Sequence, residues 1–108
     1  MRKETIILSG AMTCLVCGCF APEPPSIHSQ DPDRLIPAIK IAVKEHDQSV
    51  IPILVDDLCS DDPAIRLYAI NGLRRLTGED FGYVSYADET VRKPAVTRWK
   101  AYVADHTF

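Results

Sequence analysis

The segment from Asp62 to Gly78 constrains the fold more than any other, because it contains signals that begin and end one helix. Asp62 is a favourable N-cap directly before Pro63 at the first helical position, and Gly78 stands where a left-handed residue ends a helix. Apolar residues at helical spacing form one face: Ile65, Tyr68, Ala69, Leu73 and Leu76. Ala69 and Gly72 are small where a partner helix must approach closely. The sequence therefore predicts an amphipathic helix that packs against another helix.

A second helical pattern begins at Asp31 and Pro32, an N-cap followed by a proline that suits the first turn. Its apolar residues recur at spacings of three and four, with basic and acidic residues on the other side. The pattern ends near residues 46–47. Because Pro37 lies inside it, we expect either a late start near Asp33 or a kink.

The sequence indicates two more helices, one before the helix between Asp62 and Gly78 and one after it. One begins at Ser49, has Pro52 in its first turn, and ends before the acidic turn at residues 60–62. The last helix carries Trp99 on its apolar face, and Pro94 interrupts its beginning. We expect Trp99 to close the core and not to act as a functional aromatic residue.

The loop over residues 79–88 is too aromatic to be a simple solvated connector. Phe81, Tyr83 and Tyr86 lie within ten residues of each other. Such side chains form a surface for a ligand or partner, or they fold back over the open end of a helical hairpin. The covering role is the favoured interpretation, and the partner surface is the alternative.

The N-terminal segment has the anatomy of a signal peptide. Arg2 and Lys3 precede an apolar stretch over residues 6–16, which is too short to span a bilayer as a stable anchor. Gly18 then leads directly into Cys19, and this pair resembles the lipobox of bacterial lipoproteins. The resemblance implies that Cys19 is lipidated and becomes the mature N-terminus. A short buried helix rich in cysteine is the alternative interpretation.

The two helices over residues 49–78 resemble a HEAT repeat. The positions that carry the resemblance are Asp61, Asp62, Pro63, Ile65, Arg66, Ala69 and Leu73. The family pairs two antiparallel helices whose turn has an acidic residue before a proline, with an arginine early in the second helix. The resemblance implies an all-α fold of antiparallel HEAT-like hairpins, with about four helices in the mature domain. Asp62, Pro63, Arg66 and Gly78 would then position helices and carry out no chemistry.

The chain thus divides into three parts. Residues 1–18 are predicted to be the signal peptide, residues 19–30 a lipidated tether rich in proline, and residues 31–108 the HEAT-like helical domain. Proline favours extended geometry, so the tether is expected to be a semi-rigid spacer. The whole resembles a small bacterial HEAT-repeat lipoprotein, exported and anchored in the cell envelope.

Charge and composition argue against several classes of function. From Cys19 onward the chain has ten basic and fourteen acidic side chains, a net charge of −4, and its lysines and arginines form no patch. A nucleic-acid partner is therefore not expected, because phosphate-binding proteins present a basic face. After cleavage Cys59 would remain as a lone thiol, predicted to be a small buried apolar residue.

Residues for catalysis or metal binding are also hard to find in the sequence. The histidines are far apart and have no ligand-type neighbours: His28, His46 and His106. The acidic group lacks the ligand order of a calcium loop, and a solvated turn with helix caps explains it better: Asp56, Asp57, Asp61 and Asp62. We predict no enzyme activity, no metal, no cofactor and no small-molecule substrate.

The favoured function is a noncatalytic interaction or scaffold module whose partner is an unidentified envelope protein. Solenoid repeats leave an apolar side for a neighbour, and this chain holds only about one and a half of them. An accessory or regulatory subunit of an envelope enzyme complex is the alternative. An enzyme comes third, and it would need a concave pocket that gathers Tyr83, Tyr86 and a carboxylate such as Asp88.

Overall fold

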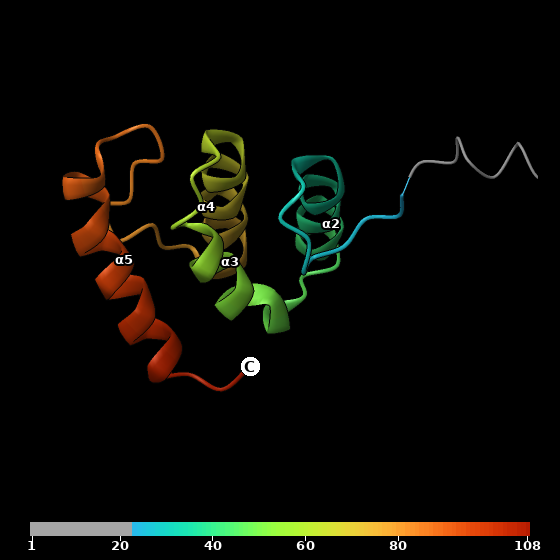
Figure 1. Ribbon diagram of the computed structural model, residues 1–108. Helices are drawn as coiled ribbons and strands as arrows, with labels where there is room; N and C mark the ends of the chain where they lie inside the picture. The colour runs from blue at the N-terminus through green and yellow to red at the C-terminus, as the bar shows by residue number, and fades with distance from the viewer. Residues whose placement is uncertain (1–22) are drawn as a thin grey trace, which may run out of the picture.

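The computed structural model describes residues 23–108, and this part of the chain is entirely helical. Its helices are α2 (Pro32–Lys44), α3 (Ile51–Asp57), α4 (Pro63–Thr77) and α5 (Glu89–Ala104), with a short 3₁₀ turn η1 (Gln48–Val50) directly before α3. Figure 1 shows α4 between α2 and α5, with α3 in front of it. The prediction of an all-α fold with about four helices is confirmed for these residues.

Aspartate side chains begin two of the helices and the 3₁₀ turn. Asp31 accepts a hydrogen bond from the Asp33 amide at 3.0 Å, and Asp62 accepts one from the Ala64 amide at 2.8 Å. Asp47 caps η1 in the same way. Gly78 ends α4 with a φ of 82°, in the left-handed region where a Cβ would be strained. The boundaries predicted for the helix between Asp62 and Gly78 are therefore confirmed.

The prolines interrupt the helices less than the sequence suggested. α2 begins at Pro32, not late near Asp33, and continues through Pro37. α5 begins at Glu89 and continues through Pro94. Each of these two internal prolines lies in the second turn of its helix, so it removes only one hydrogen bond near an end. Packing of the rest of each helix offsets that loss.

α4 is the central helix, because it packs against both α2 and α3, and α3 in turn packs against α5. The core that they enclose is aliphatic around one large indole: Leu35, Ile39, Ile51, Leu54, Leu58, Ile65, Ile70, Leu73 and Trp99 are each at most 2% exposed. Gly72 lets α2 approach α4. A Cβ at this position would lie 3.3 Å from side-chain atoms of Ile39 and Val43 on α2.

The aromatic loop folds back onto the helices. Tyr83 is buried, and its hydroxyl donates a 2.7 Å hydrogen bond to the Leu58 carbonyl at the end of α3. Phe81 contacts Trp99 edge to face, with ring centroids 4.8 Å apart. The Trp99 indole N–H donates to the Asp80 carbonyl at 3.1 Å. This packing agrees with the covering role favoured from the sequence.

The proline-rich stretch before α2 also packs on the domain where the structure describes it. The Ser26 amide donates to the Arg34 carbonyl at 3.1 Å, and the Arg34 guanidinium donates to the Pro24 carbonyl at 3.1 Å. Ile27 packs against the core. The second half of the predicted spacer therefore lies against α2, because Ile27 gains apolar contacts that an extended spacer would lose.

Two sequence expectations about burial were wrong. Cys59 is exposed, not a buried apolar residue, because it follows the last turn of α3 and faces away from the core. Asp57, assigned to a solvated turn, is only 3% exposed. No helix among residues 23–108 has the length and apolar character needed to cross a membrane.

Candidate binding site

The structural residues predicted from the HEAT resemblance lie at the ends of α4. Asp62 caps its first turn, Pro63 is its first residue, and Gly78 is its C-terminal cap. Arg66 donates to the Ser60 carbonyl at 2.9 Å and to a loop carbonyl, that of Ser85, at 3.0 Å. Arg66 thus ties the turn before α4 to the aromatic loop. Cys19, the predicted lipid attachment site, lies outside the described residues.

The three loop aromatics do not form one surface. Tyr83 lies in the core, and Phe81 is half-buried against Trp99. Tyr86 is 89% exposed, so it is the one member of the three that a partner could contact over most of its ring. Tyr83 and Tyr86 therefore do not converge with Asp88 into a pocket. Burial raises the pKa of the Tyr83 phenol, which keeps its hydroxyl protonated as a donor to Leu58.

Arginines hold this loop in place through its backbone. In addition to Arg66, Arg92 donates to the Ala87 carbonyl at 2.9 Å and Arg98 donates to the Phe81 carbonyl at 3.0 Å. The Asp80 carboxylate accepts from the Gly82 amide at 2.8 Å. That hydrogen bond, with a smaller contribution from the nearby guanidinium of Arg74, lowers the pKa of Asp80. The loop is therefore a fixed part of the fold.

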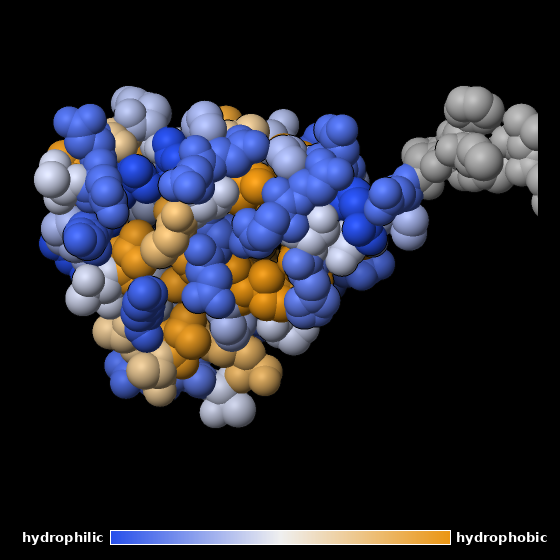
Figure 2. Space-filling view, viewed as in Figure 1, coloured by the Kyte–Doolittle hydropathy of each residue, from blue (hydrophilic) through white to orange (hydrophobic). Residues whose placement is uncertain are grey.

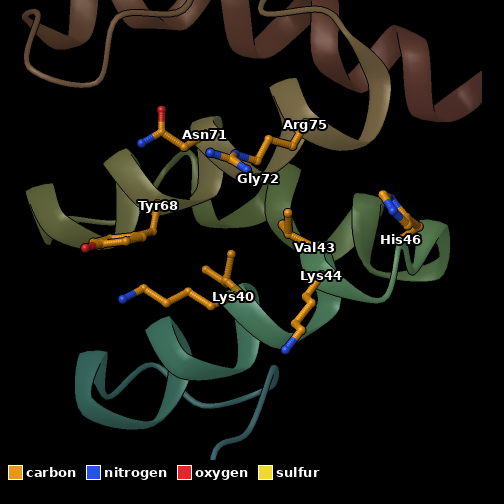
Figure 3. A pocket seen from close by; sticks show the side chains of 9 residues that line it. Lys40, Val43, Lys44, His46, Tyr68, Asn71, Gly72 and Arg75 are labelled. Atoms are coloured by element: carbon orange, nitrogen blue, oxygen red, sulfur yellow. The ribbon is translucent and has the colours of Figure 1, made fainter.

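One surface hollow is a groove between α2 and α4, with a volume of about 660 Å³. We call it the α2–α4 groove. Figure 3 shows its side chains, which come from the second half of α2, from His46 just after it, and from one face of α4. Ile39, Val43 and Gly72 form its apolar floor. Its polar residues are Lys40, Lys44, His46, Tyr68, Asn71 and Arg75.

The α2–α4 groove is basic. Lys40, Lys44 and Arg75 line it and are exposed, whereas no carboxylate of residues 23–108 does. The Lys40 ammonium lies 5.2 Å from the centre of the Tyr68 ring, a cation–π contact that directs it along the groove. In Figure 3 the Arg75 side chain extends back along α4 over Gly72. Positive charge is thus gathered on a domain whose net charge is negative.

A second, smaller hollow is lined by charges of both signs. It has a volume of about 280 Å³ and is lined by α5 and the end of α3. Carboxylates of Asp61 and Glu89 line it together with the cations Arg92, Lys93 and Lys100. Since both signs of charge are present, this hollow does not favour an anion or a cation. The α2–α4 groove is therefore the better candidate for selective binding.

Comparison with protein-family models, curated proteins and solved structures found no significant match.

Exposed apolar side chains do not point to another site. The large ones come from separate elements: Ile41, Leu67, Tyr86, Val91 and Phe108. In Figure 2 hydrophobic residues appear in the middle and lower part of the visible face, with hydrophilic residues around them. Single exposed apolar residues are normal in soluble domains. Among residues 23–108 no group of three or more histidine, cysteine or acidic side chains could hold a metal ion.

Sequence reasoning missed the α2–α4 groove. Part of the signal was present, because Lys40 and Lys44 are four residues apart and so share one face of a helix. Tyr68 and Arg75 lie two turns apart on α4 and share a face as well. The sequence does not say that these two faces lie next to each other, because that depends on how α2 packs against α4.

Proposed function

We propose that the protein is a noncatalytic interaction module, anchored by a lipid at Cys19 in a bacterial cell envelope, and that it binds a partner protein in the α2–α4 groove. The observation that carries the proposal is the groove itself. It combines an apolar floor with three exposed cations that no described carboxylate joins. Binding sites commonly pair an apolar surface with a few placed polar groups.

The groove needs no rearrangement to form. Its two walls belong to helices that already pack against each other through Gly72, and Ile39 in its floor is only 2% exposed. A preformed site avoids the entropic cost of ordering at the moment of binding. This favours a stable surface for recognition over a segment that folds only with its partner.

The HEAT resemblance supports the same function. In the proposed assignment α3 and α4 are the two helices of one repeat, with Asp61, Asp62 and Pro63 in the turn between them. α2 would be the second helix of an incomplete preceding repeat. Repeat proteins of this kind use the surface formed by successive helices for binding. The α2–α4 groove would be such a surface.

Site-specific crosslinking tests this function. The full chain carrying a photoreactive amino acid in place of Asn71, in the groove wall, should form a specific crosslinked product with another protein in native envelopes. The same photoreactive amino acid in place of Thr97, on exposed α5, is the matched control and should not give that product. Equal products from both positions, or none from Asn71, would contradict the proposal.

A further inference from the structure

We infer that the partner presents an acidic segment to the α2–α4 groove, in which carboxylates pair with Lys40, Lys44 and Arg75 while an apolar side chain contacts Val43 on the floor. This inference rests on the proposed function and adds the chemistry of the partner.

The cations outside the groove support this inference by contrast, because the arginines among them have partners and the lysines Lys93 and Lys100 share the smaller hollow with carboxylates. Arg34 has a carboxylate partner in Glu23, 3.2 Å away, and Arg74 has one in Asp80, 3.5 Å away. Arg66, Arg92 and Arg98 donate to backbone carbonyls.

The three groove cations differ from these arginines. Among the described residues they have neither a carboxylate partner nor a carbonyl acceptor. Three cations that line one groove, with no carboxylate among its lining residues, raise the local concentration of anions and attract a carboxylate-rich ligand.

The shape of the groove favours a protein segment over a lipid surface. The floor at Ile39 and Gly72 is buried, whereas the cations above it are exposed. A flat bilayer would reach the cations but not the floor, and a chain whose residues 19–108 have a net charge of −4 is repelled by anionic headgroups. A peptide side chain can pack on Val43, the half-buried residue of the floor, and its neighbouring carboxylates can then reach Lys40 and Arg75.

Charge also excludes two other occupants. The chain's own first eighteen residues carry Arg2 and Lys3 against a single acidic residue, Glu4, so they do not complement a basic groove. Nucleic acid is also disfavoured, because its phosphates would be repelled by a molecule with more acidic than basic side chains. An acidic protein segment is the occupant that complements both the cations of the groove and its apolar floor.

The experiment selects peptides on the purified full chain. A displayed library of random peptides of about twelve residues is the probe, because the length covers a groove of this size. The selected sequences should be enriched in Asp and Glu around one or two apolar residues. The affinity of a selected peptide should fall at least about tenfold when salt rises from about 50 to about 300 mM, since exposed charge pairs are screened.

Two matched double variants assign the binding to the groove. Lys40→Glu with Arg75→Glu reverses two groove cations, and Lys93→Glu with Lys100→Glu makes the same change in charge on exposed α5. The groove variant should bind the selected peptide at least about tenfold more weakly, and the α5 variant should bind within about threefold of the unmodified chain. Thermal unfolding of both variants checks that they are folded.

Several results would overturn the inference. Enrichment of neutral or basic peptides, no enrichment, or acidic peptides whose affinity the groove variant leaves unchanged would each do so. Binding of phosphatidylglycerol vesicles that the groove variant loses, without peptide selection, would assign the groove to a headgroup. Self-association that the groove variant abolishes would assign it to a second copy.

The crosslinking experiment separates this inference from the proposed function. If the photoreactive residue at position 71 captures a partner and the selected acidic peptides do not compete, the interaction function stands and the acidic chemistry is wrong. If no partner is captured and no peptide is selected, both proposals are wrong. Competition by the acidic peptides supports both.

Discussion

Asp57 is a buried carboxyl group with an incomplete set of hydrogen bonds. Gln30 donates to one of its oxygens at 3.4 Å, and the other oxygen, Oδ2, has no partner among the described residues. Burial raises the pKa of Asp57 to about 6, the Gln30 hydrogen bond opposes this shift, and the charge of Asp56 adds to it. Ionisation of Asp57 therefore works against folding at neutral pH.

Asp57→Asn should stabilise the protein at pH 7 to 8. The folded-state pKa is about 6 and the model-peptide value is 3.8, so the unfolded chain releases the proton more readily. Protonated Asp57 contributes fully to the free energy of unfolding below about pH 4, and this contribution is lost as the pH rises through 6. A shift of this size corresponds to about 2 to 3 kcal/mol at most. Thermal unfolding should show a higher Tm for the variant at pH 7.5.

The gain should shrink as the pH falls toward 4, where Asp57 itself is protonated. Asp61→Asn, which removes an equal charge from an exposed position, is the control and should change Tm little at either pH. A variant less stable than the unmodified protein at pH 7.5 would contradict the assigned burial cost.

Tyr83→Phe should cost about 1 kcal/mol of unfolding free energy, because it leaves the buried Leu58 carbonyl without its 2.7 Å donor. The ring itself stays in the core, so packing is retained. Tyr86→Phe removes a hydroxyl from a side chain that is 89% exposed and should be neutral. Urea unfolding of the two variants measures the difference, and equal midpoints would contradict a structural role for the Tyr83 hydroxyl.

At the scale of the elements, local signals predicted most of what was found. An aspartate N-cap acts within three residues of itself, and a glycine C-cap depends on its own φ, so both can be recognised without the rest of the chain. The helix ends predicted from these signals agree with the structure at Asp31, Asp62 and Gly78. The prolines were less informative, since tertiary packing carried α2 and α5 through Pro37 and Pro94.

The aspartate N-cap of α4 gives a prediction about the stability of this helix. Asp62→Ala removes the acceptor of the Ala64 amide and should destabilise the protein by about 1 kcal/mol. Asp61→Ala changes the preceding exposed aspartate, whose side chain caps no helix, and should cost less than about 0.5 kcal/mol. Guanidinium unfolding of both variants tests the comparison. A larger effect at Asp61 would mean that charge, and not the cap, stabilises this turn.

The burial of single residues was harder to predict, for a physical reason. Asp57 and Cys59 are only two positions apart, at the end of α3, and which of them faces the core depends on what packs there. Gln30 and the aromatic loop approach this end of α3 from distant parts of the chain. The residue type alone contains no information about such neighbours, so the usual burial of a lone cysteine and the usual exposure of an aspartate assigned both residues wrongly.

At the scale of the whole molecule, the candidate site exists only because α2 packs against α4. Each wall of the α2–α4 groove was visible in the sequence as a helix face with cations, but neither face alone is a site. The close approach permitted by Gly72 brings the two faces together. Sequence reasoning therefore predicted the class of fold, but it could not predict that these two helix faces lie side by side.

The proposed membrane anchor can be tested on the whole chain. If Cys19 is lipidated as proposed, the intact mass of protein extracted from membranes should match residues 19–108 plus acyl groups. Cys19→Ser should appear in the soluble fraction at the unprocessed mass, whereas Cys59→Ser, at the exposed thiol after α3, should stay with the membrane. Membrane association of the Cys19→Ser chain would contradict this anchor.

The docking of residues 24–30 against α2 sets how far the domain can stand from a membrane. Only four residues, 20–23, would lie between the acylated Cys19 and Pro24, whose carbonyl oxygen accepts a hydrogen bond from Arg34. Even fully extended, the five residue steps from Cys19 to Pro24 span at most about 18 Å. If Cys19 is acylated as proposed, the domain would therefore stay close to the headgroups, and a partner would meet the α2–α4 groove near the surface of that membrane.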